Sequence, residues 1–145
     1  MAGDVISTVF VPPTVRPGVF VYAVRNVPGL LMLGRFEVTL DAQDPRTGRT
    51  TTGVANRISN AAGYFSLPDF TADASFPEVT VKMVDGSSNP ALGGTFWFFH
   101  APLTDVLYTL TVKDLRTGVS RPYSNGSRSS EQLCGAVDTN AFRGP

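Results

Sequence analysis

Apolar and polar side chains alternate with a period of two in three stretches of the chain. The stretches are "RFEVTLD" (35–41), "EVTVKMV" (78–84) and "VLYTLTVKD" (106–114). In the first stretch the apolar positions are Phe36, Val38 and Leu40, and polar residues fill the positions between them. This period is that of a strand with one face in a core and the other in water. The stretches are also rich in the β-branched and aromatic residues that favour strands.

Two near-identical turns follow two of these stretches. "DPRTG" (44–48) and "DLRTG" (114–118) each stand between an alternating segment and a polar one. An aspartate opens such a turn by bonding the backbone, and a glycine supplies the positive φ at its exit. The sequence therefore predicts two hairpins. The two strand–turn–strand units are either a weak internal repeat or a chance recurrence of a common turn.

No stretch of the sequence shows a convincing helical spacing of apolar residues, and Gly or Pro interrupts nearly every window. Strand signals instead recur at short intervals, separated by polar loops such as "FTADASFP", "DGSSNPALGG" and "YSNGSRSSEQ". A chain of 145 residues is of one-domain size. We therefore predict an all-β, single-domain antiparallel β-sandwich, immunoglobulin-like or jelly-roll-like, or a flattened barrel.

The first 29 residues differ from the rest. Two apolar segments, "VISTVFV" and "VFVYAV", are set off by Pro12-Pro13, Pro17-Gly18 and Pro28-Gly29. They are either edge strands of the same fold or an arm that adds to a neighbouring sheet, since a strand with free backbone groups is a template for pairing. We therefore divide the chain into N-terminal strands or an arm (1–29) and a β-sandwich domain (30–145).

The stretch "GGTFWFFHAPLTD" (93–105) holds four consecutive aromatic residues, including the only Trp, followed by the only His. Burying one aromatic ring contributes about 4–6 kcal/mol, from roughly 150–250 Å² at ~25 cal/mol per Å². Exposing all four rings would forgo roughly 15–25 kcal/mol, more than the whole stability of most domains. In a strand, Phe96, Phe98 and His100 point to one side, and Trp97 and Phe99 point to the other. Because of the energy argument above, at least one of these two faces must lie in the core.

The other face of that strand presents Trp97 and Phe99. It is covered by another segment of the chain ("VFVYAV" or "DTNAF"), forms a protein–protein interface, or serves as a platform for sugar rings. Tyr64 and Tyr123 are the further candidates for such a platform. These four aromatic residues are the predicted binding residues.

Charge argues against several partners. The 12 basic and 12 acidic side chains cancel, so no net field attracts nucleic acid or an anionic membrane. No apolar run approaches the ~18 residues of a membrane span, so we expect no membrane insertion. A net charge near zero suits a protein that associates with itself or with a protein partner.

Catalytic chemistry finds little support in the sequence. His100 is the only imidazole and Cys134 the only thiol, and no G-x-S-x-G motif surrounds a serine. A Cys134–His100 pair is the remaining option for a nucleophile with a base. We favour instead a polar tip at a strand end for His100 and a small hydrophobe for Cys134. The chain is predicted not to be an enzyme.

The sequence gives equally little support for a metal site, and no cofactor is expected. One Cys and one His are too few for a zinc site. Calcium needs only oxygen ligands, and four aspartates lie near loops: Asp85, Asp105, Asp114 and Asp138. No D-x-D-x-D-G spacing is present, and turn capping is the competing interpretation of these carboxylates.

Several motifs in fixed order resemble a known family. They are "GRFEVTLD", "GYFSLPDF", "EVTVKMVDG", "FWFFHAPLTDVLYTLTVKDLRTG", "YSNG" and "DTNAF", spanning residues 34–142. Together they resemble a small β-rich domain that recurs in predicted secreted and surface proteins of bacteria and has no assigned activity. The chain departs from the pattern at "FSLPDF" and at "SNG". The resemblance implies an extracellular or cell-surface module and carries over no catalytic or ligand residues.

The start, "MAGDVISTVFVPP", lacks the features of a signal peptide. The chain is therefore expected either to stay in the cytoplasm or to be a mature or truncated form. The function predicted is a non-catalytic structural or interaction module. Its partner would be another protein or a second copy, bound through the N-terminal arm, the aromatic strand face, or both. The alternative is a carbohydrate-binding module with Trp97, Phe99 and Tyr64 as its platform.

Overall fold

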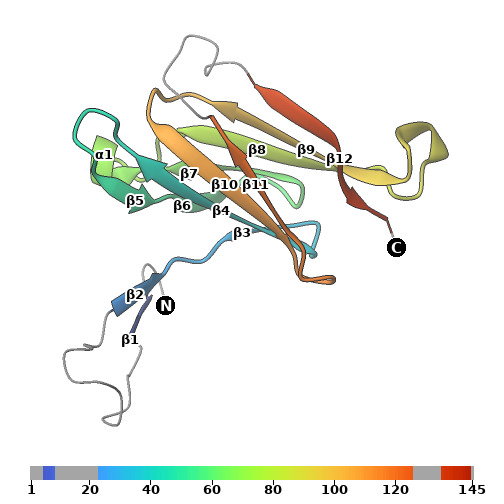
Figure 1. The fold of residues 1–145 in the computed structure, drawn as a ribbon, viewed down its shortest axis with the longest axis horizontal. Coiled ribbons are helices and arrows are strands. Elements are labelled where there is room, and N and C mark those ends of the chain that lie inside the picture. The colour runs from blue at the N-terminus through green and yellow to red at the C-terminus, as the bar shows by residue number, and fades with distance from the viewer. Residues whose placement is uncertain (1–4, 9–22, 126–134, 145) are drawn as a thin grey trace.

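The computed structural model describes residues 5–8, 23–125 and 135–144, and of the first 26 residues only the backbone of 5–8 and 23–26. The described chain is nearly all strand, which confirms the prediction of an all-β sandwich (Figure 1). Its elements are β1 (Val5–Thr8), β2 (Ala23–Asn26), β3 (Leu30–Met32), β4 (Phe36–Gln43), β5 (Thr50–Thr52), β6 (Val54–Arg57), β7 (Ala62–Ser66), α1 (Pro68–Thr71), β8 (Val79–Asp85), the 3₁₀ helix η1 (Pro90–Leu92), β9 (Thr95–Pro102), β10 (Leu107–Asp114), β11 (Ser120–Ser124) and β12 (Ala136–Arg143).

Two five-stranded antiparallel sheets make the sandwich. Sheet I has the order β11-β10-β4-β3, with β5 also paired to β4. Sheet II has the order β12-β9-β8-β7-β6. β3 and β5 pair with successive halves of β4, at Phe36–Val38 and Asp41–Gln43. Figure 1 shows the strands of sheet I lying across those of sheet II.

The core lies between the sheets, where the sequence pattern predicted it. Along β4 the residues Phe36, Val38 and Leu40 are fully buried. The other core residues are Leu30, Met32, Ala42, Phe65, Leu67, Val79, Val81, Met83, Phe96, Phe98, Val106, Tyr108, Leu110, Val112, Ala141 and Phe142. The three alternating stretches thus form β4, β8 and β10, each with its apolar set facing inward.

Both predicted turns close hairpins. The turn at 44–48 joins β4 to β5, and the turn at 114–118 joins β10 to β11. In each, the glycine N–H donates to the aspartate carbonyl over 2.7 Å. Gly48 has a φ of 74° and Gly118 a φ of 78°, the left-handed region where glycine carries no steric cost. The turn prediction is therefore confirmed in both places.

The edges of the sandwich are tied by the chain itself. At Gly53 the chain passes from β5 in sheet I to β6 in sheet II, so close to the core that a Cβ there would lie 2.9 Å from the Leu40 side chain. Nearby, the Arg57 Nη1 donates to the Leu31 carbonyl over 2.8 Å. At the opposite edge the Tyr123 hydroxyl of β11 donates to the Asp138 carboxylate of β12 over 2.8 Å. Polar contacts therefore join the two sheets on both sides.

The prediction that no helix is present was wrong, because α1 forms one short helical turn. Pro68 opens α1 from its first turn, a position where a missing N–H costs nothing. Ala72 ends the helix in a left-handed conformation with a φ of 59°. A four-residue helix is too short to produce a periodic apolar stripe, which is why the pattern does not reveal it.

The N-terminal strands form a sheet of their own. β1 pairs antiparallel with β2, from Val5 opposite Asn26 to Thr8 opposite Ala23. Among the described strands, neither pairs with sheet I or sheet II. Residues 27–29 connect the hairpin to β3, and Figure 1 draws it apart from the two layers.

Candidate association surface

The face of sheet II that points away from the core is mostly apolar. Strand register places its side chains together, because residues directly opposite in neighbouring strands share a face. In this way Tyr64 pairs with Thr80, Lys82 with Phe99, Val84 with Trp97, and Phe99 with Val137. We call this set, with Ala101, the outer face: Tyr64, Thr80, Lys82, Val84, Trp97, Phe99, Ala101 and Val137. Lys82 is its only charged member.

Burial separates the two faces of β9 as the sequence predicted. Phe96 and Phe98 are 5% and 0% exposed, so this face is core. Trp97 and Phe99 are only partly buried, and they project to the other side. Among the described strands there are two five-stranded sheets and one hairpin, so no third sheet is paired into the sandwich over the outer face.

Phe99 is the centre of a shallow groove of about 310 Å³. The groove is lined by Phe99 together with Thr80, Val81, Lys82, His100, Ala101, Gly135, Ala136 and Val137. The Lys82 ammonium lies 4.5 Å from the centroid of the Phe99 ring, a cation–π contact. Val137, opposite Phe99 on β12, is 51% exposed. The groove is thus apolar with one cation beside it.

Trp97 is held by the loop that precedes its strand. Its indole Nε1 donates to the Leu92 carbonyl of η1 over 3.2 Å. η1 is itself capped by Asn89, whose side chain accepts from the Ala91 N–H over 3.0 Å. The only hydrogen-bond donor of the indole is therefore bonded within the chain, and the ring presents apolar surface.

Three of the four predicted binding residues lie on the outer face, and the fourth does not. Tyr64, Trp97 and Phe99 project from β7 and β9 of sheet II. Tyr123 belongs to β11 of sheet I, and its ring packs 4.9 Å from Phe98 and 5.9 Å from His100. Burial and the Asp138 hydrogen bond raise the pKa of Tyr123. Tyr123 therefore packs between the sheets.

His100 was expected as a polar tip at a strand end; it lies two residues before the end of β9 and belongs to that same inner cluster. Its Nδ1 lies 3.0 Å from the Tyr108 hydroxyl. Burial lowers the pKa of His100 and raises the pKa of Tyr108 to about 12. A neutral imidazole is the form that such a site favours. Cys134, the other half of the predicted thiol–imidazole pair, lies outside the described residues.

The four candidate calcium ligands are spread over separate sites. Asp85 accepts from Ser87, and Asp105 lies 3.4 Å from the Arg46 guanidinium. Asp114 accepts from Arg35, and Asp138 accepts from Tyr123 and from a backbone N–H within its own strand. Within residues 27–125 and 135–144, no group of three His, Cys, Asp or Glu side chains could hold a metal ion. Turn capping accounts for Asp85 and Asp114 through their bonds two residues ahead.

Sequence reasoning did not name five members of the outer face: Thr80, Lys82, Val84, Ala101 and Val137. The signal for the first three was present, because the alternation in "EVTVKMV" places them opposite the core positions. No such signal marks Val137. The register of β12 against β9 shifts between Asp138 and Phe142, so its sequence does not alternate cleanly.

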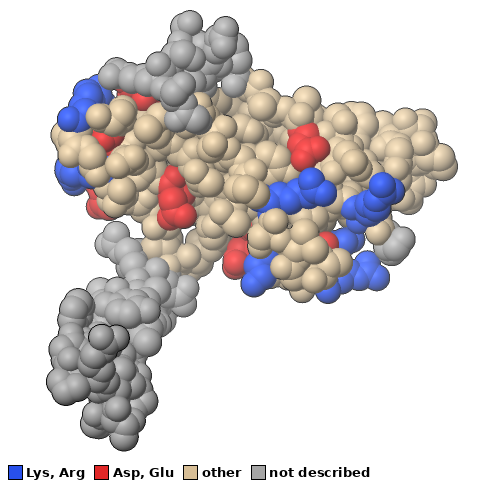
Figure 2. Space-filling view, in the orientation of Figure 1, with Lys and Arg blue, Asp and Glu red and all other residues tan. Residues whose placement is uncertain are grey.

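The outer side of sheet I is different in kind. Along β4 and β10 it presents polar and charged side chains: Glu37, Thr39, Asp41, Thr109, Thr111 and Lys113. Figure 2, viewed from this side, shows charges of both signs distributed over the surface. A recess of about 690 Å³ lies at one end, lined mainly by residues of β4, β5 and β10. Of the two outer sides, that of sheet II gathers aromatic and aliphatic side chains, with Lys82 among them.

Comparisons with known proteins found no match: no protein family, no curated protein and no solved structure matches the chain. Among the described residues, no helix has the length and apolar character needed to span a membrane.

Proposed function

We propose that this protein is a non-catalytic self-association module whose contact surface is the outer face of sheet II. The observation that carries the proposal is the apolar set around Phe99, with Val137 half exposed beside it. An exposed apolar patch rimmed by polar residues is typical of an interaction site. The neutral net charge of the chain adds no electrostatic repulsion between copies.

The size of the face fits this role. Five strands about 4.8 Å apart and about six residues long span on the order of 500 Å² of flat sheet. Covering such a face with a partner surface of equal area would remove on the order of 1,000 Å² from water, the lower limit for a specific interface. By resemblance to secreted and surface domains, we place the module in an extracellular or surface-exposed assembly.

The contacts of His100 favour a role without catalysis. A general base is normally oriented by a group that stabilises its protonated form, such as a carboxylate. The polar partner of His100 is the Tyr108 hydroxyl, and burial lowers the pKa of the imidazole. This environment disfavours the imidazolium that base catalysis would have to form.

Sedimentation velocity over a wide concentration range tests the proposal with a matched pair of variants. Val137 and Val119 are 51% and 50% exposed, but Val119 lies outside the outer face, at the end of the 114–118 turn. We expect the wild type to self-associate, Val137→Asp to weaken association at least tenfold, and Val119→Asp to leave it unchanged. Equal behaviour of all three proteins would refute the proposal.

Carbohydrate binding is the second candidate, because Tyr64, Trp97 and Phe99 share the outer face. Three features weigh against it. Lys82 already lies over the Phe99 ring, and the Trp97 N–H is bonded within the chain. From the strand geometry, the Cα atoms of Tyr64 and Phe99 are also about 12 Å apart. A glycan array with Trp97→Ala as control discriminates: binding that this variant abolishes would favour the sugar platform over self-association.

A further inference from the structure

Among the described strands, the β1–β2 hairpin is a two-stranded sheet that pairs with neither sheet I nor sheet II, and no further sheet is paired over the outer face. A two-stranded hairpin alone in water is marginally stable, and it needs a further strand or an apolar surface to persist. The outer face is an apolar surface of that kind.

The sequence of the hairpin segment suits such a surface. "VISTVFV" and "VFVYAV" are among the most apolar stretches of the chain, and they contain no acidic residue. The outer face contributes one charge, that of Lys82. Packing one against the other, with Arg25, the one charged residue of β1 and β2, directed away from Lys82, would therefore bury apolar side chains.

The length of the link between β2 and β3 determines whether the hairpin can reach the outer face of its own chain or only that of another copy. β2 ends at Asn26 and β3 begins at Leu30, so four Cα steps join them, and these span at most about 14 Å. β3 belongs to sheet I. Packed layers lie about 10 Å apart, so a hairpin on the outer face of sheet II would lie about 20 Å from sheet I. The hairpin cannot lie across the outer face of its own chain while β2 and β3 keep their described ends.

We propose that the β1–β2 hairpin of one copy packs on the outer face of sheet II of a second copy. This inference rests on the proposed function and names the element that occupies the association surface. In a two-fold pair the exchange is reciprocal, so each dimer contains two such contacts. The partner is thus a second copy of this chain, and the contact is between hairpin and sheet rather than between two sheets.

Full-length variants that damage one side of the contact at a time provide the test. Ile6→Asp with Val24→Asp places carboxylates on the hairpin strands and leaves the outer face intact. Val137→Asp damages the outer face and leaves the hairpin intact. Thr14→Asp, between β1 and β2 in the sequence, controls for added charge. Circular dichroism and thermal unfolding verify that every variant keeps a folded sandwich.

We expect the double variant and Val137→Asp each to lose self-association at least tenfold, and Thr14→Asp to resemble the wild type. Mixing the double variant with Val137→Asp should restore a one-to-one complex, because one intact hairpin then meets one intact face. Fluorescence energy transfer between the two labelled proteins measures this complex.

Two results would overturn the inference while sparing the proposed function. One is a double variant that associates like the wild type when Val137→Asp does not. The other is a mixture that forms no complex although both variants are folded. If Val137→Asp associates as strongly as the wild type, the proposed function and this inference both fail.

Discussion

The turns at 44–48 and 114–118 differ in a single residue, yet they occupy opposite environments. Both aspartates accept the backbone N–H two residues ahead, over 2.9 Å in the first turn and 3.0 Å in the second. Asp44 bonds otherwise within its own turn, to Arg46 and Thr47. Asp114 is 1% exposed and accepts two bonds from Arg35, over 2.9 and 2.7 Å.

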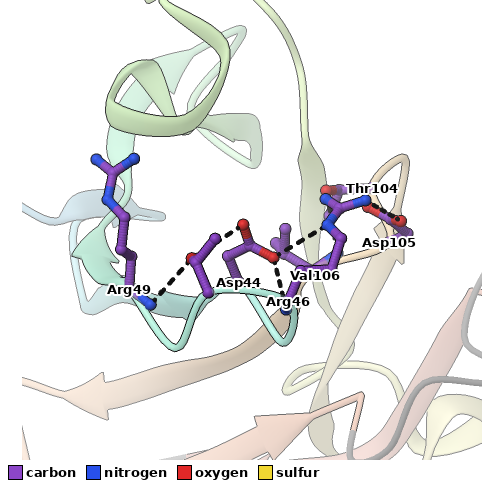
Figure 3. A network of polar contacts seen from close by, with 7 residues as sticks. Asp44, Arg46, Arg49, Thr104, Asp105 and Val106 are labelled. Atoms are coloured by element: carbon purple, nitrogen blue, oxygen red, sulfur yellow. Dashed lines mark hydrogen bonds and ion pairs between the residues drawn. The ribbon is translucent and has the colours of Figure 1, made fainter.

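The difference comes from what the neighbouring strand supplies. Asp114 lies opposite Phe36 in the β4–β10 ladder, which puts Arg35 beside it from the other end of the chain. The Arg35 guanidinium also lies 5.1 Å and 4.9 Å from the ring centroids of Phe36 and Phe96. The segment that lies near Asp44 is 104–106, and it brings no second arginine to the aspartate. The Arg46 side chain of the turn instead reaches Asp105, as Figure 3 shows. Local sequence therefore determines the shape of the turn, and a distant residue determines what the aspartate contributes.

The largest expected effect separates Asp114→Asn from Asp44→Asn. The first substitution leaves the Arg35 charge largely buried without its counter-ion, which typically costs about 3–5 kcal/mol. The second removes hydrogen bonds within an exposed turn, so we expect a much smaller loss. Urea unfolding followed by tryptophan fluorescence measures both. Similar losses in the two variants would show that the Arg35–Asp114 pair adds nothing beyond the turn.

The sequence was sufficient to predict the two turns but not the Arg35–Asp114 ion pair. The D-x-R-T-G spacing predicts both hairpins, and the alternation around Val38 predicts the buried face of β4. The same alternation places Arg35 on the water-facing side, where the structure has it partly buried against Asp114. Arg35 and Asp114 are 79 residues apart, and only the register of β4 against β10 brings them together.

The candidate site shows the same limit. Period two along β9 was sufficient to place Trp97 and Phe99 opposite the core. It does not tell which sheet a more distant strand joins, so Tyr123 was grouped with them although it lies in sheet I and packs inward. Face assignments within one strand are local, whereas assignments between strands depend on sheet order.

Acid sharpens the comparison of the two aspartates. The Arg35 hydrogen bonds lower the pKa of Asp114 to about 2, from a usual value near 4. Between these values the unfolded state binds more protons than the folded state, so stability is lost as the pH falls. We expect the stability gap between wild type and Asp114→Asn to be full above pH 4 and to close towards pH 2. Urea unfolding at a series of pH values checks this, and a gap that persists at pH 2 would contradict it.

The two turn glycines should respond alike, in contrast to the aspartates. Gly48 and Gly118 both have positive φ, and a Cβ at either would meet nothing within 4 Å. Gly48→Ala and Gly118→Ala should therefore each cost about 1 kcal/mol, from backbone strain alone. Thermal unfolding of the two variants measures the difference between them. A much larger loss for Gly118→Ala would mean that strain at the turn is transmitted to the buried Asp114.

The smallest effect is expected at the exposed ion pairs of the first turn. The Arg46 guanidinium lies 3.2 Å from Asp44 and 3.4 Å from Asp105, with its side chain 56% exposed. Exposed pairs of this kind contribute little, because water screens the charges and ordering a long side chain costs entropy. Arg46→Gln should leave the urea midpoint within error of the wild type at both low and high salt. Arg35→Gln is the matched variant in the second turn, and it should lower that midpoint clearly, since it leaves the Asp114 carboxylate buried without its cation. A loss of similar size in both variants would mean that the two arginines act alike, and that the contrast between the turns lies in the aspartates rather than in their partners.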